Sequence, residues 1–555
     1  MDDTRHPWRL MAAWANRARS PFALVLGFGA AAASVIGVGI TAHGSLRWTS
    51  IWLYLLIVAV TPAFAVLFAL LRWLVERPRR RPQPVWRNRP RSFFFDWVVI
   101  WAAWVPVWLS GWPGFWCYDA RIAYQSAREG VIDTALPPLH TFLATGVEAQ
   151  VAAWTGHHNY GIAAWTLLQS LVVAGVFAFT LRRLRAWRAP RVVRWGSLAY
   201  FALFPTIALF SLNWARNTLY SALVLALAVC VVDAVKDPRR RRWWLIGLLA
   251  LAAVTMRRDA IYVFAVIAVV VALARQPARK ALAICFGGAA IVGALIDPVV
   301  YRGLLDLAPG SQRVAYSLPL QQLARVYNDT ADPMTPDQRR LLEWYVSTEA
   351  LEAYRPQLAD PVFVGASDRR LESGSKGLIR LWARVGLEHP RAYADALAAA
   401  TVQGWLPGAV IDAYSTAGPA GLYPTTGTSY FCYATERPGT ATPKGPAFLH
   451  RAYAAFSHES RVPFETPIVA WLWSPGTYLW VFVFAFGLSW AWNRRGRQTA
   501  FWPVGMLVLA TCVPIFAGPA MLVRYFLALF YCLPLVAAFL IDPRVYALPT
   551  GAAGR

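Results

Sequence analysis

Apolar stretches separated by short polar joints make up most of this chain. Stretches long enough to cross a hydrocarbon layer of roughly 30 Å recur from about residue 21 to residue 541. Hydrophobic residues form 57% of the chain, which also contains 28 Trp, more than the cores of a soluble protein need. The pattern therefore predicts an all-α polytopic membrane protein.

Five clusters of basic residues indicate how the chain is oriented. They lie at 72–91, 182–194, 236–242, 275–280 and 494–497. Cytoplasmic loops of membrane proteins are enriched in Lys and Arg, so all five are expected in the cytoplasm. This placement requires about 12 transmembrane helices with both chain ends inside. The predicted spans are 21–43, 49–71, 93–111, 160–181, 196–212, 218–235, 243–256, 260–274, 281–300, 467–492, 500–517 and 523–541.

The net charge of +25 is then mainly an orientation signal. A nucleic-acid partner is the other interpretation of a basic chain, but these charges are dispersed between apolar spans, so none is expected. The apolar run 21–42 follows several arginines, as a secretory signal would. It is too long and lacks a clear cleavage site, so we expect a retained first span.

The spans divide the chain into five predicted parts. They are two spans with a basic cytoplasmic linker at 1–92, a membrane core at 93–300 whose first outer loop is 112–159, an outer domain at 301–466, C-terminal spans at 467–545 and a cytoplasmic tail at 546–555. Segment 301–466 is too polar for the membrane and large enough for a small mixed domain. Within it, Thr335-Pro-Asp-Gln338 predicts a helix start, because Thr335 caps and Gln338 returns the capping bond.

Asp119 lies in the short aromatic loop 114–120, which the charge pattern places just outside the membrane. A carboxylate there is suited to chemistry on a lipid-linked substrate, although a loop aspartate is often only solvated. The neighbouring Trp116 and Tyr118 belong either to the interfacial aromatic belt or to a surface that stacks on sugar rings.

Arginines occur at the outer ends of two predicted hairpins, against the usual charge bias. Arg257 and Arg258 form the turn of the short hairpin 243–274, and Arg524 follows the turn of the last hairpin. A guanidinium group donates two parallel hydrogen bonds and stays charged, which suits a phosphate. The alternative is that these side chains reach lipid head groups or pair with Asp259. Because each leg of 243–274 has about fifteen residues, the turn is expected below the outer surface.

Cysteines and histidines leave alternatives open. Only Cys117 and Cys432 fall in predicted outer segments, where a disulfide between them and two unpaired thiols are both compatible with an oxidising compartment. His157 and His158 lie beside an outer span end and are either metal ligands or structural, and no companion acid supports the first role.

Motifs along about 95–540 resemble those of a known superfamily. An Asp in the first major outer loop, a Pro-Pro-Leu segment after it, short outer loops with a second polar site and a late outer domain look like the GT-C fold of polyprenyl-phosphate-sugar-dependent glycosyltransferases. Four segments resemble, more narrowly, an uncharacterised bacterial family of such proteins related to the mannosyltransferase-like group. They are Ser317-Leu-Pro-Leu-Gln-Gln-Leu-Ala-Arg-Val326, Glu388-His-Pro-Arg-Ala-Tyr393 followed by Gly404-Trp-Leu-Pro407, Ser474-Pro-Gly-Thr-Tyr-Leu-Trp480 and Arg524-Tyr525.

The resemblance implies an enzyme of the bacterial cytoplasmic (inner) membrane whose active site faces outward. An acceptor hydroxyl of an envelope lipid, glycan or protein would attack the anomeric carbon of a sugar carried on a polyprenyl phosphate. Asp119 would be the general base or would orient the acceptor. The implied donor ligands are Arg257, Arg258, Arg524, Arg216 and Asn217, and the implied substrate contacts are Trp116, Tyr118, His140 and Tyr525.

The sequence departs from the resembling proteins at two positions. Leu136 precedes the Pro-Pro pair where a His or Lys is usual, which leaves His140 as the nearest titratable group. The second outer loop has Asn213, Arg216 and Asn217 where an acid often stands, so use of a divalent metal stays open. Two other function classes are therefore alternatives: a flippase or transporter for a lipid-linked glycan, and a catalytically degenerate scaffold. The clustering of charged residues at outer ends, in two unlike halves, favours the enzyme over a transporter.

Overall fold

The computed structural model of the chain describes residues 19–77, 91–274, 278–410, 431–433, 436, 443–454, 467–494, 496 and 499–548. Within these ranges seven helices are long and apolar enough to cross a membrane, or eight if one bent pair counts as a single span. The seven are α2 (Pro21–His43), α3 (Ile51–Glu76), most of α4 (Arg91–Ser110), α7 (His158–Ala186), α10 (Arg216–Lys236), α13 with η2 (Arg279–Leu304), and η5 with α25 (Val523–Ile541). The protein is a multi-pass, all-α membrane protein.

Shorter apolar helices fill the remaining predicted segments. They are α11 (Trp243–Met256), α12 (Ala260–Leu273) and α24 with η4 (Trp502–Ala517). At 14 residues each, α11 and α12 are about 21 Å long, less than the roughly 30 Å of a hydrocarbon layer. Every predicted segment contains a helix, but length and composition identify only seven or eight of them as complete spans.

Two predicted single spans are broken at proline. The expected span 196–212 consists of α8 (Arg191–Leu203) and α9 (Pro205–Ser211), bent by 54°. The expected span 467–492 consists of α22 (Pro467–Trp473) and α23 (Pro475–Arg494). Proline lacks a backbone N–H and disfavours the α conformation of the residue before it, so each helix ends there and a new one starts.

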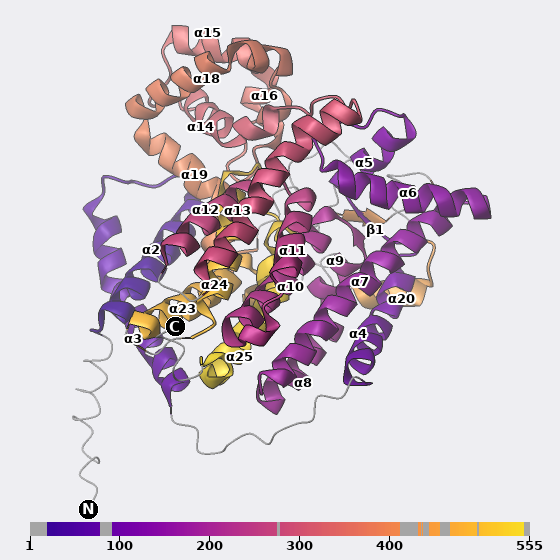
Figure 1. The fold of residues 1–555 in the computed structure, drawn as a ribbon. Helices are drawn as coiled ribbons and strands as arrows, with labels where there is room; N and C mark the ends of the chain where they lie inside the picture. Colours follow the sequence, from indigo (N-terminus) through magenta and orange to yellow (C-terminus); the bar gives the residue numbers. More distant parts are fainter. Residues whose placement is uncertain are drawn as a thin grey trace, which may run out of the picture.

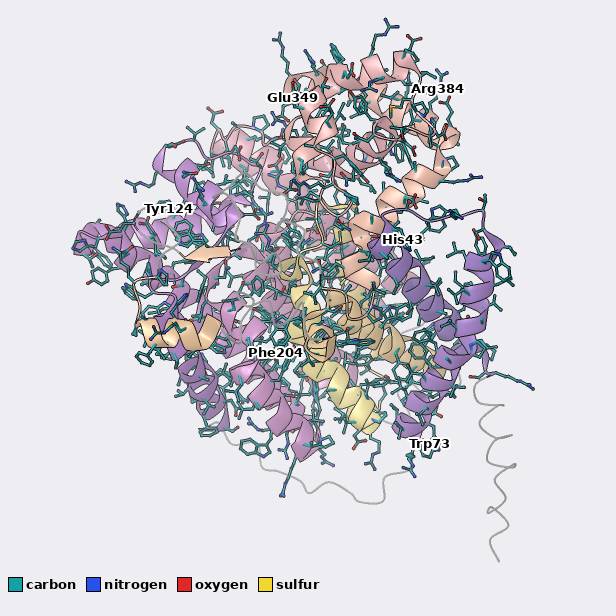
Figure 2. All side chains as sticks on the ribbon, turned by 180° about the vertical axis from the view of Figure 1, so that it is seen from behind. His43, Trp73, Tyr124, Phe204, Glu349 and Arg384 are labelled. Atoms are coloured by element: carbon teal, nitrogen blue, oxygen red, sulfur yellow. The ribbon has the colours of Figure 1, made fainter. Side chains whose placement is uncertain are left out.

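The basic clusters at the ends of α3, α7, α10 and α23 lie at one end of the bundle, here called the basic end. The Trp492 indole donates a hydrogen bond to Glu76 at 2.9 Å, and Arg183 pairs with Asp233 at 2.6 Å. Figure 2 shows Trp73 at this end and Glu349 and Arg384 at the opposite end. The arrangement is the one expected if all these clusters share one side of a membrane.

At the opposite end, residues 317–405 form a helical layer that Figure 1 shows at the top of the molecule. Its helices are α14 (Ser317–Tyr327), α15 (Pro336–Tyr345), α16 (Thr348–Glu352), α17 (Asp360–Val364), α18 (Asp368–Glu388) and α19 (Pro390–Trp405). The predicted capping box at the start of α15 is confirmed, with Thr335 and Gln338 bonded reciprocally. Leu320, Leu342 and Leu378 are among the residues of a separate apolar core that stabilises this layer.

The predicted outer domain 301–466 occupies two places rather than one. β3 (Phe431–Tyr433) joins a three-stranded sheet with β1 (Phe115–Cys117) and β2 (Asn213–Trp214), and α20 (Ala447–Ala454) packs against α4. The later part of the segment therefore returns to the first outer loop, which itself consists of α5 (Tyr118–Arg128) and α6 (Pro138–Thr155).

Two of the sequence motifs that carried the family resemblance contact each other at the base of the helical layer. Ser474 donates a hydrogen bond to the Leu406 carbonyl at 3.3 Å, and the Gly408 N–H donates to Thr477 at 3.0 Å. A Cβ on Gly476 would lie 2.4 Å from that same carbonyl oxygen, so only glycine allows this approach. These contacts join α19 to α23 and set the layer over the membrane helices.

Candidate functional site

The short sheet determines where Asp119 lies. β1 pairs in parallel with β2, Phe115 opposite Asn213 and Trp116 opposite Trp214, and each strand leads directly into a helix. Asp119 is in the first turn of α5 and Arg216 is the first residue of α10. Parallel pairing therefore brings together two residues that are 97 positions apart in the chain.

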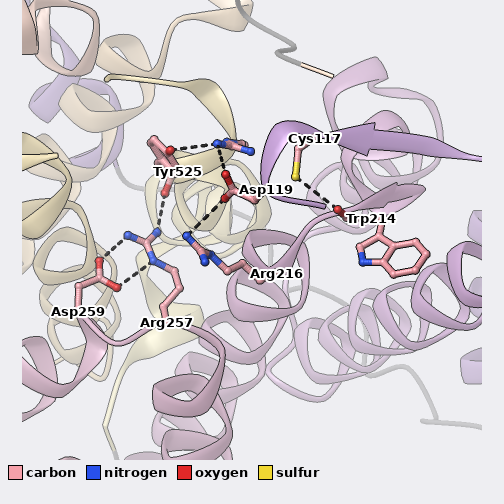
Figure 3. Close-up of polar contacts among 8 residues, drawn as sticks. Cys117, Asp119, Trp214, Arg216, Arg257, Asp259 and Tyr525 are labelled. Atoms are coloured by element: carbon pink, nitrogen blue, oxygen red, sulfur yellow. Dashed lines mark hydrogen bonds and ion pairs between the residues drawn. The ribbon is translucent and has the colours of Figure 1, made fainter. Parts of the chain in front are cut away.

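The Asp119 carboxylate lies between two arginines, as Figure 3 shows. Its Oδ1 accepts a hydrogen bond from Arg524 Nη2 at 3.3 Å, and its Oδ2 pairs with Arg216 Nη2 at 3.4 Å. The same Arg524 nitrogen donates to the Tyr525 hydroxyl at 3.1 Å. Burial raises the pKa of Asp119, but Arg524 and then Arg216 outweigh it and hold the pKa below its ordinary value. Asp119 is therefore ionised.

A second arginine group adjoins this one at the turn between α11 and α12. Arg257 pairs with both carboxylate oxygens of Asp259 and donates to the Tyr525 backbone carbonyl at 3.4 Å. Its guanidinium also lies 4.9 Å from the centre of the Tyr220 ring. Arg258 pairs with a different acid, Asp297, at 2.8 Å. The sequence leaves two alternatives to phosphate binding for Arg257: contact with lipid head groups and an ion pair with Asp259. The structure shows the ion pair, which fixes the guanidinium in place.

One cavity of about 580 Å³ is lined by both arginine groups. Its wall includes seven of the predicted site residues: Asp119, Arg216, Asn217, Arg257, Arg258, Arg524 and Tyr525. The helical layer supplies other parts of the wall, Asp360 and Phe363 from α17 among them. The cavity therefore lies where the apolar helices meet that layer.

Two buried donors at the cavity wall have no hydrogen-bond partner in the structure. They are Nη1 of Arg216 and Nδ2 of Asn217, the first two residues of α10. Burying an unpaired donor is unfavourable by about 1–3 kcal/mol, so such groups usually have an acceptor in the working protein.

A family model matches residues 137–545, more than half of the chain. It describes a family of unknown function, DUF6020. The chain belongs to this family. No curated protein and no solved structure matches the chain. The DUF6020 match contains Arg216, Arg257 and Arg524 and begins after Asp119, so the cavity combines residues from inside and outside the matched region.

Trp116 does not reach the cavity, contrary to its predicted role in binding substrate. It is 1% exposed and stacks on Trp214, with ring centres 5.2 Å apart. Its edge-to-face contact with Tyr124 completes a small core that holds β1 and β2 together. Tyr118 begins α5, and its side chain lies outside the described part of the structure.

His140 lies behind Asp119 rather than in the main cavity. It lines a small adjoining cavity of about 10 Å³ together with Asp119 and Arg216. Burial, with Arg216 adding to it, lowers the pKa of His140 to about 3, so the imidazole is neutral. His140 therefore does not line the main cavity, and the small cavity that it shares with Asp119 has room for about one water molecule.

Cys117 is a free thiol whose Sγ donates to the Trp214 carbonyl at 3.4 Å. Burial raises the pKa of this thiol. In the β1–β3 register Cys117 faces Phe431, while Cys432 faces Trp116. Cys117 is free in the structure, so the disulfide alternative is wrong for Cys117, while the side chain of Cys432 lies outside the described part of the structure.

The structure allows a search for a divalent-metal site among the described residues. Among them no group of three His, Cys, Asp or Glu residues lies close enough to hold one. His158 pairs with Glu148 at 2.6 Å, which supports the structural role for that histidine. Asp119 and Asp259 are each paired with arginine.

Arg313 and Asp360 complete the cavity and were not predicted from the sequence. Asp360 comes from the helical layer and Arg313 from the segment just before it, where charged residues are common and no membrane bias makes an arginine unusual. Arg313 pairs with Asp368 at 2.9 Å and lies before α14. Only the packing of the layer on the bundle shows that they face the cavity.

Proposed function

We propose that this protein is an integral membrane glycosyltransferase. It moves a sugar from a polyprenyl-phosphate donor to an envelope acceptor, either a lipid, a glycan or a protein, on the outer face of the bacterial cytoplasmic membrane. The chain crosses that membrane twelve times, with both ends and the basic end in the cytoplasm. The observation that carries the proposal is the cavity whose wall contains Asp119, its partners Arg216 and Arg524, and Arg257.

The size and position of the cavity support a lipid-linked substrate. At about 580 Å³ it is within the range of roughly 300–1,000 Å³ typical of sites for small molecules. The turn at Arg257 follows a 14-residue helix that barely spans the membrane, so the guanidinium would lie below the outer surface among apolar helices. A polyprenyl tail in the membrane would thus bring its phosphate to the depth of these arginines.

The arginines supply the electrostatic part of catalysis. The donor is a phosphodiester with one negative charge, and the phosphate carries more charge as the bond to the sugar breaks. Arg524 is 2% exposed and held by Asp119 and Tyr525, so it is already oriented before substrate binds. Fixed cations of this kind stabilise the leaving phosphate more in the transition state than in the ground state.

Asp119 becomes a stronger base when the donor enters. In the structure its charge is neutralised by Arg216 and Arg524, whose pull keeps its pKa low. A donor phosphate competes for the same two guanidinium groups, which weakens that pull and raises the pKa. The acceptor hydroxyl then attacks the anomeric carbon, its proton passes to Asp119, and the bond from that carbon to the phosphate oxygen breaks.

One observation keeps a transporter as a second candidate. The DUF6020 match covers the arginines that would bind a lipid phosphate but begins after Asp119. A protein that only moves a lipid-linked glycan between leaflets needs the phosphate ligands and no base. A degenerate scaffold would likewise bind without transfer.

The test is sugar transfer in reconstituted membranes. Wild type, Asp119→Asn and the matched control Asp337→Asn are supplied with radiolabelled polyprenyl-phosphate mannose, glucose or arabinose and with envelope acceptors. Asp337 is 88% exposed on the helical layer, so its change repeats the chemistry outside the cavity. Transfer by wild type and the control, but not by Asp119→Asn, supports the enzyme. Absence of transfer with each donor, while a labelled lipid changes leaflet, supports the transporter.

A further inference from the structure

A second cavity lies at the basic end, far from Asp119. It has a volume of about 150 Å³ and lies between α7, α10 and α11. Its apolar wall contains Phe179, Leu245 and Ile246, and its polar wall contains arginines from the short connection between α10 and α11. These are Arg239, Arg240 and Arg242. Such a site offers an apolar surface and several cations within one cavity.

The acid in this cavity is already neutralised by other residues. Asp233 accepts hydrogen bonds from Arg183 at 2.6 Å and from the Trp187 indole at 2.8 Å. Arg240 pairs with Asp237 at 3.1 Å. Among the described residues Arg239 and Arg242 form no ion pair, so their charges are available to a ligand.

The cavity lies at the level where an apolar helix begins. α11 starts at Trp243, directly after Arg242, and Trp244 is 70% exposed. Tryptophan is enriched at the boundary between hydrocarbon and water, which places the arginines at head-group depth and the apolar wall at acyl-chain depth. The ligand that matches both is a phosphate joined to an apolar tail.

We propose that this cavity binds the phosphate head group of an anionic phospholipid. Arg239 and Arg242 hold the phosphate with paired N–H donors, and Leu245 and Ile246 contact the first part of the lipid chains. Basic pockets between membrane helices on the cytoplasmic side bind anionic head groups in this way. The site is independent of sugar transfer, because it lies at the other end of the bundle from Asp119.

The experiment measures lipid binding by the purified full-length protein in neutral detergent, using native mass spectrometry. Short-chain phosphatidylglycerol, phosphatidylcholine and inorganic phosphate are titrated separately. At roughly fivefold per arginine, Arg239→Gln/Arg242→Gln should weaken phosphatidylglycerol binding by about 25-fold. Arg239→Lys/Arg242→Lys keeps the charge and should retain most of the affinity. Phosphatidylcholine should bind weakly and equally to all variants.

A matched control removes the same charge from the same end outside the cavity. Arg279 and Lys280 are exposed at the start of α13, and Cys285 of that helix donates to the Trp243 carbonyl beside the site. Equal losses of phosphatidylglycerol binding in Arg279→Gln/Lys280→Gln and in the cavity variant would overturn the proposal, because surface charge alone would explain both. Inorganic phosphate that binds as tightly, with the same dependence on Arg239 and Arg242, would overturn the lipid assignment.

Discussion

Two aspartates, each paired with arginine, differ in burial and in how they are held. At the basic end Asp96 is fully buried, and one guanidinium of Arg185 binds both of its oxygens, one of them at 2.6 Å. At the cavity Asp119 receives one contact from each of two arginines, at 3.3 and 3.4 Å. The side chains are chemically the same. We call the Asp96 pair closed, because one guanidinium binds both oxygens and neither is exposed, and the Asp119 pair open, because its carboxylate remains partly exposed to the cavity.

The difference separates a structural ion pair from an exchangeable one. A bidentate pair with no exposed oxygen has no room for a ligand and stabilises the contact of α4 with α7. The Asp119 contacts are longer, and its side chain remains 19% exposed to the cavity. Under the proposed function, the donor phosphate would replace the carboxylate at Arg216 and Arg524.

The largest expected effect comes from breaking the open pair. Asp119→Asn should lower sugar transfer by about 10²–10⁴-fold, the contribution of a positioned acid or base. Its thermal unfolding temperature should stay close to that of wild type, because the lost contacts are long. Transfer and unfolding are measured on the same preparation, with Asp337→Asn as control. A large fall in unfolding temperature would mean that the Asp119 ion pairs stabilise the fold, as the Asp96 pair does.

The closed pair should behave in the opposite way. Asp96→Asn removes the charge partner of Arg185, whose side chain is 19% exposed, and should destabilise the protein by about 3 kcal/mol, the low end of the range for a broken buried pair. Denaturant unfolding in detergent measures this change, again against Asp337→Asn. Transfer per folded molecule should be unchanged. Loss of transfer with full stability would mean that the two pairs do not differ in role.

The sequence predicts the position of a residue in this site only where a local sequence signal marks that residue. Arg257, Arg258 and Arg524 stand out in the sequence because they oppose the charge bias at the outer ends of spans, and the structure brings all three to one cavity. Asp119 stands out by its aromatic surroundings. Yet those aromatic residues mislead for Trp116, since its burial depends on β2, a strand of only two residues that no local pattern predicts.

The helices were predicted better than their breaks and contacts. Apolar length predicts where each helix lies, because that signal is local in the sequence. The bend at Pro205 is also local and was missed by treating 196–212 as one apolar run. The position of Arg313 is different, since only long-range packing of the helical layer on the bundle brings it to the cavity.

A smaller effect should appear in the pH dependence of transfer. Arg524 and Arg216 hold the pKa of Asp119 below its ordinary value, so the base is ionised above that pKa and activity is lost as pH falls through it. Removing one cation in Arg216→Gln should raise the pKa and move the acid limb of kcat/KM upward by about one pH unit. An unchanged limb would mean that Asp119 is not the titrating base.

The smallest effect is expected at Arg258, which lines the cavity but pairs outside it. Its side chain is 42% exposed and shares Asp297 with Arg302, which lies 3.3 Å from that acid. Arg258→Gln therefore leaves Asp297 paired, and an exposed pair of this kind contributes only about 0–1 kcal/mol. We expect a rise of about threefold to fivefold in the donor KM, with kcat and the acid limb unchanged. If Arg258→Gln instead moved the acid limb as far as Arg216→Gln, Arg258 would act directly on Asp119. The pKa of Asp119 would then depend on Arg258 as well as on Arg216 and Arg524.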